Sequence, residues 1–346
     1  MYKEKNYSNW YEKRFEELKK NIEEVSMSKS LNIVTNIKYL HDDMKYSDNF
    51  NHYYYPDIFD KNFNVSIDVI ILKKIPNLGV DKFIQLKLEN FAKLYVFWLW
   101  DNHHMEIINY ELSTLSDITF CAHSYCMDYL VNFYSILGGH VAPSIWQWSA
   151  KDSASHFEKY GDIPRHNALY GGYREYSDQS NRHQIVQACI DAISDNALYL
   201  RSEMLDVAED KYFSLDREER FREWCSHKVS LNLPLDKDFG CRIFDALLCG
   251  QIPLVANNIF DLDTLIPPPL QQELPVIRFE EPTVECISDA YSKALSRFDQ
   301  DGNEGVRRRH RYVLENHMSI HRIREILANI NVAGWKSQDT IQGERP

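Results

Sequence analysis

The stretch that most constrains the fold of this chain is KVSLNLPLDKDFGCRIFDALLCGQIPLVA, Lys228 to Ala256. It contains an apolar segment, a polar loop, an apolar helical segment that ends at Gly250, and a second apolar segment. Two apolar strands joined through a helix form a βαβ unit, which predicts a parallel sheet. Ligands of open parallel sheets bind where loops leave the carboxyl ends of the strands. We therefore expect a ligand site in the polar loop, which carries Asp236, Asp238, Phe239 and Gly240.

Length and composition limit the organisation of the chain and its partners. With 346 residues, the chain is long enough for two domains of ordinary size. A net charge of -12 repels polyanions, so we expect no nucleic-acid partner. The 7 cysteines are scattered and include no Cys-x-x-Cys pair, which indicates reduced thiols in a cytosol and no zinc site.

The relation of the chain to membranes follows from three segments. The N-terminus is too charged for a signal peptide. The longest apolar stretch, near Leu94 to Trp100, is shorter than the roughly 20 residues that a spanning helix requires. The basic run Arg307–Arg311 is interpreted as a solvated helix face, with contact to an anionic membrane or a phosphate as the alternative. We predict a cytoplasmic protein, with the inner face of the membrane as a further hypothesis.

Apolar runs predict two α/β halves. The first half has an amphipathic opening helix at about Tyr7–Ser28 and strands at Leu31–Ile37, Val65–Leu72, Leu94–Trp100 and Asp117–Ala122. The second has strands at Ala168–Tyr170, Leu198–Leu200, Lys228–Leu233, Ile252–Ala256 and Pro275–Phe279, a helix at Asn181–Ile193, and a helical tail at Val284–Asn331. The segment between the halves has no clear periodicity and is interpreted as a linker. The predicted division is a first domain 1–150, a linker 151–167, a second domain 168–331 and a tail 332–346.

Part of the Lys228–Ala256 stretch resembles a known family. An acid followed by Ala-Leu-x-Cys-Gly-x-x-Pro-Leu-Val is similar to the donor-binding element of group 1 glycosyltransferases, which have the GT-B fold. The match consists of Asp245, Ala246, Leu247, Cys249, Gly250, Pro253, Leu254 and Val255. The resemblance extends over about Ala168–Ile330 and is a fold pattern only in the first half. It implies two Rossmann-like domains that face each other across a cleft, with the last helix returning to the first domain.

The resemblance also implies roles for single residues. In the family, the acid at the position of Asp245, usually a Glu, binds the ribose hydroxyls of a nucleotide sugar. Retaining members have another acid at a fixed spacing before it, which contacts the sugar. Lys237 occupies that position here, between Asp236 and Asp238. Either neighbour is a candidate for the sugar contact, and Asp238 is also a candidate helix cap, so the sugar contacts and the stereochemical course stay open.

The remaining candidate donor residues lie around the first strand of the second half. Gly171 and Gly172 allow close approach of the backbone to a ligand, or serve a plain turn, and Arg174 and Arg182 follow as cations for a phosphate. The backbone N–H groups of Phe239 and Gly240 are further candidate phosphate donors. The predicted donor-binding set is Gly171, Gly172, Arg182, Asp238, Phe239, Gly240 and Asp245.

The first half carries candidate catalytic residues where the apolar strand YVFWLW ends. Asp101, His103 and His104 follow this strand. An imidazole oriented by a carboxylate accepts a hydroxyl proton near neutral pH. The alternative is that Asp101 caps a helix and that the histidines are surface residues. His123 and His140 follow later in this half and are candidates for the acceptor side. Two imidazoles and a carboxylate also suit a metal, but the resemblance implies catalysis without a bound metal or cofactor.

We predict a glycosyltransferase that moves a sugar from a nucleotide sugar to a glycan or lipid-linked acceptor. The resemblance points to bacterial surface polysaccharide synthesis. Two alternatives remain open: a catalytically inactive GT-B-like module that binds a glycan or a protein, and a nucleotide-sugar epimerase of similar fold. The nucleotide, the sugar and the acceptor are not defined by the sequence.

Overall fold

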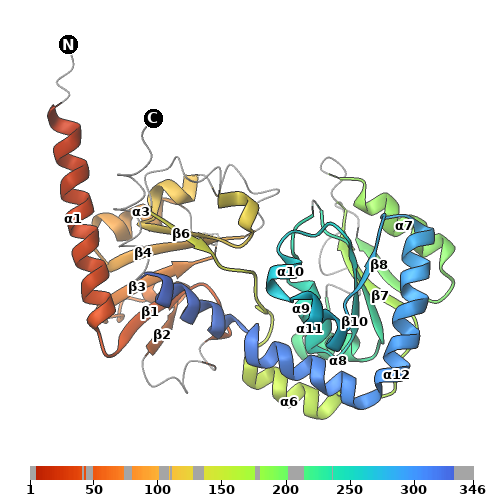
Figure 1. Ribbon diagram of the computed structural model, residues 1–346. Helices are drawn as coiled ribbons and strands as arrows, with labels where there is room; N and C mark the ends of the chain where they lie inside the picture. The colour runs from red at the N-terminus through yellow and green to blue at the C-terminus, as the bar shows by residue number, and fades with distance from the viewer. Residues whose placement is uncertain are drawn as a thin grey trace. The chain divides into compact units, whose positions relative to one another are not determined.

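The protein divides into two compact units, Met1–Ala142 with Ile320–Pro346, and Pro143–Ser319 (Figure 1). The computed structural model describes residues 5–40, 43, 50–73, 80–100, 109, 111–127, 136–175, 180–201, 214–235 and 237–330. Each unit contains its own parallel sheet. None of the described helices is long and apolar enough to cross a membrane.

The sheet of the first unit has six strands in the order β2-β1-β3-β4-β5-β6, and all pairs are parallel. The strands are β1 (Leu31–Thr35), β2 (Phe50–Tyr54), β3 (Ile67–Leu72), β4 (Ala92–Leu99), β5 (Ile118–Cys121) and β6 (Ile136–His140). Every residue of β3 and nearly every residue of β4 is buried. Continuous apolar runs of this kind form central parallel strands that are covered on both faces.

Helices and short helical turns flank this first sheet. They are α1 (Lys5–Met27), η1 (Tyr55–Phe59), α3 (Val80–Leu88), η2 (Ser124–Cys126) and the helical residues 320–330. Phe83 of α3 packs edge-on against Tyr95 of β4 at 5.6 Å between ring centroids, and Asn21 of α1 donates to Lys93 O. Because residues 320–330 belong to the first unit, the prediction that the C-terminal helix returns to it is confirmed.

The sheet of the second unit has five parallel strands in the order β11-β10-β9-β7-β8. The strands are β7 (Leu169–Arg174), β8 (Asn196–Arg201), β9 (Val229–Asn232), β10 (Ile252–Ala256) and β11 (Ile277–Phe279). The chain builds outward from β7, first to β8 on one side and then to β9 on the other. This reversal of strand order between β7 and β9 is a topological switch point, where ligands of open parallel sheets bind.

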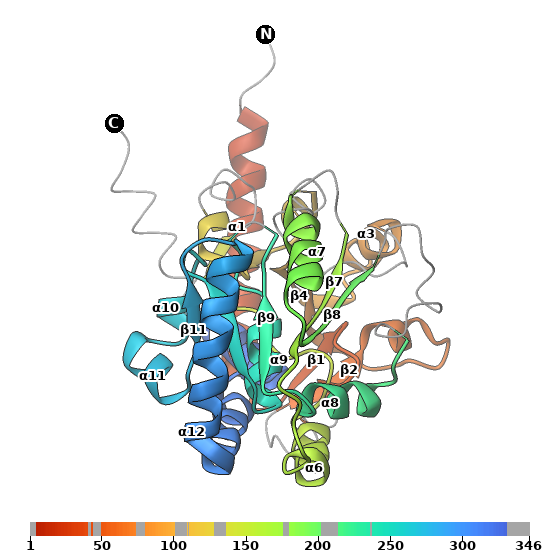
Figure 2. The same ribbon diagram turned by 90° about the vertical axis from the view of Figure 1, so that its right-hand side faces the viewer.

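Seven helices accompany this second sheet in the described residues. They are α6 (Ala150–Tyr160), α7 (Arg182–Ala192), α8 (Arg217–Cys225), α9 (Arg242–Leu248), α10 (Leu262–Leu265), α11 (Pro268–Glu273) and α12 (Val284–Asn316). The helix α12 contacts α9, β10 and β11 and runs beside α7 (Figure 2). The βαβ unit predicted from Lys228–Ala256 is β9-α9-β10, with the predicted helix end at Gly250, whose φ of 77° favours glycine.

Part of the basic run in α12 stabilises the end of α9. Arg309 Nε donates to Gly250 O at 3.0 Å, and His310 Nδ1 donates to Leu248 O at 2.6 Å. Both side chains are buried, and Arg309 also pairs with Asp301 at 3.0 Å. Cations and donors at a helix C-terminus satisfy its last carbonyls and oppose its dipole. The interpretation of Arg307–Arg311 as a solvated face is therefore wrong for these two residues.

The structure differs from the predicted division of the chain in two places. The chain divides after Ala142, and most of the predicted linker 151–167 is α6, a helix of the second unit. Ser149 accepts from the backbone N–H of Asp152 at the start of this helix, which is a regular N-cap. The polar residues of this segment, together with Pro143 and Pro164, led to its interpretation as a linker.

Two strands of the first sheet are absent from the prediction, β2 and β6. The β2 sequence FNHYY has Asn51 and His52 side by side between aromatic residues, and β6, ILGGH, contains two glycines, so neither has the alternating or continuous apolar pattern of a strand. A Cβ atom at Gly138 would lie 2.4 Å from the ring of Phe120. Glycine is used in β6 so that this ring of β5 packs against the strand.

Candidate functional site

The carboxyl ends of β7 and β9 meet at the switch point of the second sheet. The helix after each of these strands begins with an arginine, Arg182 in α7 and Arg242 in α9. The Arg182 guanidinium lies 5.5 Å from the centroid of the Tyr173 ring, and that of Arg242 lies 5.3 Å from it. Two cations from two different helices therefore converge on one tyrosine at this edge of the sheet.

Tyr173 is a fixed platform for the two guanidiniums. It is fully buried, and its hydroxyl donates to Leu231 O at 2.5 Å. Burial raises the pKa of Tyr173 to about 12, although Arg242 and Arg182 act in the opposite direction. The phenol therefore stays uncharged near neutral pH, and its ring attracts the cations through its π face.

Main-chain oxygens hold both arginines in place. Arg182 donates to Arg174 O at 3.0 Å and to Leu233 O at 3.4 Å, and Arg242 donates to Gly172 O. Within the part of the chain that the structure describes, no carboxylate forms a salt bridge with Arg242. Positive charge that is oriented by carbonyls attracts an anion, and a guanidinium fork suits phosphate oxygens.

Asn232 adds a polar group to the same edge as the last residue of β9. Its side chain is 6% exposed, and its Nδ2 donates to Ser230 Oγ at 3.1 Å. Its Oδ1 is buried and accepts no hydrogen bond from the described residues. A buried acceptor at the carboxyl end of β9 can accept a hydrogen bond from a hydroxyl or N–H group of a bound molecule.

The sequence interpretation did not include Arg242 or Asn232 in the site. Arg242 is the first residue of the helix after β9, and Arg182 is the first residue of the helix after β7. This shared position is the signal in the sequence that could have identified Arg242. Asn232 directly precedes Leu233-Pro234, the point where the apolar strand ends.

The predicted glycines have different surroundings. Gly171 and Gly172 lie within β7 and are buried, so they do not form the loop after the strand. A Cβ atom at Gly171 would lie 3.0 Å from the Tyr173 ring, so this glycine makes room for the tyrosine. Gly240 is exposed, and a Cβ atom there would meet nothing within 4 Å. Of these three, only Gly240 borders open space.

The predicted acids and Phe239 are directed into the protein. Asp238 is 3% exposed, and Phe239 packs against Phe244 at 4.9 Å between ring centroids. Asp245 is fully buried in α9 and accepts a hydrogen bond from Gln147 Nε2 at 3.0 Å. Its assignment to the ribose hydroxyls stays a prediction, and such a contact requires Gln147 to release the carboxylate.

Two predicted histidines lie at the carboxyl edge of the first sheet. His123 follows β5, is buried and stacks on Tyr125 at 5.8 Å between centroids. His140 ends β6, which pairs with β5, and its Nε2 donates to Ala122 O at 3.2 Å. The strand β4, which precedes the predicted catalytic residues, pairs with the other side of β5.

The predicted catalytic residues Asp101, His103 and His104 lie outside the described residues. Their roles stay predictions. Among the residues that are described, no group of three His, Cys, Asp or Glu side chains is arranged to hold a metal ion. All 7 cysteines are free thiols.

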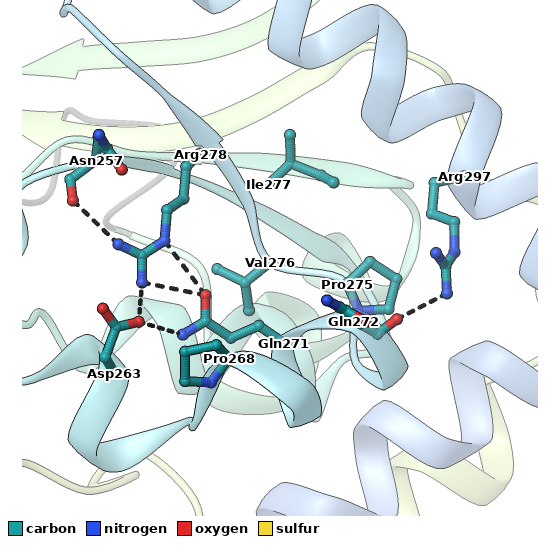
Figure 3. A pocket seen from close by; sticks show the side chains of 10 residues that line it. All are labelled: Asn257, Asp263, Pro268, Gln271, Gln272, Pro275, Val276, Ile277, Arg278 and Arg297. Atoms are coloured by element: carbon teal, nitrogen blue, oxygen red, sulfur yellow. Dashed lines mark hydrogen bonds and ion pairs between the residues drawn. The ribbon is translucent and has the colours of Figure 1, made fainter.

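A separate hollow of about 660 Å³ lies beside the edge strand β11 (Figure 3). Arg278 at its wall pairs with Asp263 and also donates to Gln271 Oε1. Arg297, also at the wall, pairs with Asp301. None of the predicted site residues lines this hollow. Its cations are neutralised by carboxylates, in contrast to Arg242 at the switch point.

The comparisons with known proteins find similarity in structure. No protein-family model matches the chain, and no curated protein matches it. An alpha-glucosyltransferase in complex with UDP-glucose and DNA containing an abasic site is 12% identical, with a TM-score of 0.53 over 87% of this chain and 99% of that chain. A sucrose-phosphate synthase from Thermosynechococcus elongatus is 11% identical, with a TM-score of 0.42 over 80% of this chain and 75% of that chain. An alpha,alpha-trehalose-phosphate synthase from Burkholderia vietnamiensis is 9% identical, with a TM-score of 0.45 over 80% and 73%.

The fold class follows from the two sheets and the alpha-glucosyltransferase match. Two parallel α/β units, with a C-terminal helix that belongs to the first, define a GT-B fold. The predicted GT-B fold class, with two Rossmann-like α/β units and a C-terminal helix that belongs to the first unit, is confirmed. At 12% identity, the match concerns the fold and not the reaction.

Proposed function

We propose that this protein is a glycosyltransferase that moves a sugar from a nucleotide-sugar donor to a hydroxyl group of a glycan or lipid-linked acceptor. The observation that carries the proposal is the convergence of Arg182 and Arg242 on Tyr173 at the switch point of the second sheet. A nucleotide sugar has its negative charge in a pyrophosphate, which two guanidiniums bind well. The GT-B fold supports this assignment as a fold-level analogy.

The donor would bind along the carboxyl edge of the second sheet. Arg182 and Arg242 would hold the pyrophosphate, and Asn232 Oδ1 would accept a hydrogen bond from a donor hydroxyl or N–H group. The open space at Gly240 gives room for the ligand beside its backbone. Asp245 stays the predicted partner of the ribose hydroxyls. In the bound state, these hydroxyls would replace the amide of Gln147, which donates to the carboxylate in the structure.

In the proposed reaction, the acceptor oxygen replaces the nucleoside diphosphate at the anomeric carbon of the sugar. The acceptor oxygen forms a bond to the anomeric carbon, and the bond from that carbon to the phosphate oxygen breaks. The nucleoside diphosphate leaves with the electron pair, and guanidiniums stabilise its developing charge. The acceptor proton passes to an imidazole, for which His103 or His104, oriented by Asp101, is the predicted base. We propose no metal or cofactor for this exchange.

The acceptor is proposed to interact with the first unit, through His123 and His140 at the carboxyl edge of its sheet. The net charge of -12 disfavours a nucleic-acid acceptor, although DNA is present in one of the similar structures. A role in bacterial surface polysaccharide synthesis, in the cytoplasm or at the inner face of the membrane, is part of the same proposal.

The test is a binding and turnover experiment on the full chain. A panel of nucleotide sugars is titrated by calorimetry, and the donor that binds is then incubated with glycan and lipid-linked acceptors while released nucleoside diphosphate is measured. We expect saturable binding of one nucleotide class and acceptor-dependent release. Binding without release would identify a binding module, and conversion of the sugar without acceptor would identify an epimerase. If no nucleotide sugar binds, the proposal is wrong.

A further inference from the structure

Two loops at the carboxyl edge of the second sheet contain strained residues. Lys237, after β9, has a φ of 55°, and Asp261, after β10, has a φ of 62°. Non-glycine residues rarely adopt this left-handed conformation, and they cluster at functional sites when they do. The backbone N–H of Phe260 donates to Lys237 O at 2.8 Å, which joins the two strained loops.

The joined loops present two side chains to solvent. Phe260 is 43% exposed, which is unusual for a large apolar side chain, and Lys237 is exposed as well. The next residues along the first loop, Asp238 and Phe239, are buried and anchor it. Among the described residues, no carboxylate pairs with the ammonium group of Lys237.

A cation and an aromatic face together select a particular kind of sugar. An aromatic ring packs against the C–H face of a pyranose, and an ammonium group pairs with a carboxylate. The pyrophosphate site proposed above lies over β7 and β9, whereas Lys237 and Phe260 lie on the loops that follow β9 and β10. Lys237 lies in the loop between β9 and Arg242, and Phe260 follows β10, so the two side chains extend the same edge from the pyrophosphate site toward β10. A second positive charge beside that site suits a second negative charge on the donor.

We propose that Lys237 and Phe260 bind the sugar of the donor, and that this sugar is a hexuronate whose carboxylate pairs with Lys237. This inference rests on the proposed function. It concerns which nucleotide sugar binds, and not whether one binds.

The test uses matched donors that differ only at the carboxylate. The full chain is titrated with UDP-glucose and UDP-glucuronate, UDP-galactose and UDP-galacturonate, and GDP-mannose and GDP-mannuronate. We expect the acidic member of one pair to bind at least about tenfold more tightly than the neutral member. One charge-assisted hydrogen bond supplies a difference of this size. Lys237→Gln should remove this preference, so that the acidic and the neutral member of the pair bind with similar affinity. The matched control is Lys293→Gln, which changes an exposed lysine of α12. This variant should keep the preference for the acidic donor.

Phe260→Ala tests the ring separately from the charge. It should weaken both members of the preferred pair by a similar factor, and the unfolding midpoint is measured beside it to show that the variant is folded at the assay temperature. If a nucleotide sugar binds but the acidic member has no advantage, or if Lys237→Gln keeps the advantage, the hexuronate inference is wrong and the proposed function stands. If none of these six donors binds, the hexuronate inference is wrong, and the proposed function is wrong as well only if the wider panel of nucleotide sugars does not bind either.

Discussion

The carboxyl edges of the two sheets carry different chemistry on the same type of scaffold. The edge of the second sheet has the guanidiniums of Arg182 and Arg242 against Tyr173, and the exposed ammonium of Lys237. The edge of the first sheet has the imidazoles of His123 and His140. Both sheets are parallel and bury their central strands, so the difference lies in the side chains that follow the strands.

This difference separates two tasks. Guanidiniums keep their charge at all accessible pH values and suit a ligand that carries permanent negative charge. Imidazoles change their charge near neutral pH and suit a hydroxyl group that must lose a proton. In the proposed reaction, the second unit would bind the donor and the first would activate the acceptor. Variants at the two edges should therefore fail in different ways.

The largest effect is expected from the predicted base in the sequence that follows β4. Replacing His103 and His104 separately by Ala should lower kcat about 10²- to 10⁴-fold in one of the two variants, because general base catalysis contributes this much. Donor affinity, measured by calorimetry, should not change. If neither replacement lowers kcat by this much, neither histidine is the base, and another residue has this role.

His310, a buried imidazole of the second unit, is expected to affect stability and not catalysis. Burial, with a smaller contribution from Arg311, lowers the pKa of His310 from 6.5 to about 4, and the hydrogen bond to Leu248 O opposes this shift in part. The unfolded chain then binds more protons than the native protein between these values. Stability is therefore lost as pH falls from 6.5 toward 4, by up to about 3 kcal/mol for this group.

Denaturant unfolding of the wild type and of His310→Gln at a series of pH values measures this loss. The difference in unfolding free energy between the two proteins should shrink as the pH falls. A constant difference across the range would show that His310 does not titrate in this way. Donor binding should be the same in both proteins, since this imidazole contacts α9 carbonyls and not the switch point.

Arg242→Ala tests the cationic edge. Losing a charge-assisted hydrogen bond of about 1.5 to 3 kcal/mol should weaken donor binding roughly tenfold to hundredfold. Arg242→Lys should recover part of the affinity, because the charge stays while the fork is lost. Arg222→Ala, an exposed arginine of α8, is the matched control and should bind the donor as the wild type does. Unchanged affinity in Arg242→Ala would remove this arginine from the site.

The smallest effect concerns the backbone of Lys237. Lys237→Gly should raise the free energy of unfolding by up to about 1 kcal/mol, because glycine adopts the left-handed conformation without strain, although it gains freedom in the unfolded chain. Lys237→Ala keeps the strain and should give no such gain. Chemical denaturation measures both variants. A Lys237→Gly protein that is less stable than Lys237→Ala would show that the conformation is not strained.

Sequence analysis predicted the parts of the fold that depend on local patterns. The segment Lys228–Ala256 forms β9-α9-β10 because its apolar runs, its loop and Gly250 all specify the same local structure. The strand β6 was missed, because Gly138 is explained only by the ring of Phe120 on the neighbouring strand and Gly139 only by its φ of 119°. Most of the predicted linker is α6, whose cap at Ser149 is regular but whose polar residues, between Pro143 and Pro164, were interpreted as those of a linker.

The candidate site was predicted less completely, because its contacts join residues far apart in the chain. Arg242 donates to Gly172 O across 70 positions, and Gln147 donates to Asp245 across 98. Arg309 looked like part of a solvated basic run until its contact with Gly250 O, 59 positions away, was placed by the fold. Local spacing does not contain these pairings. Arg182 was predicted because the family resemblance implies a basic residue after the first strand of the second half.

A crystal structure of the protein soaked with the nucleotide sugar that binds most tightly tests the central claim most directly. The proposal predicts that the pyrophosphate is ordered at the carboxyl ends of β7 and β9, with its oxygens within hydrogen-bonding distance of the guanidiniums of Arg182 and Arg242. A pyrophosphate ordered at the edge of the first sheet, or in the hollow beside β11, would contradict it.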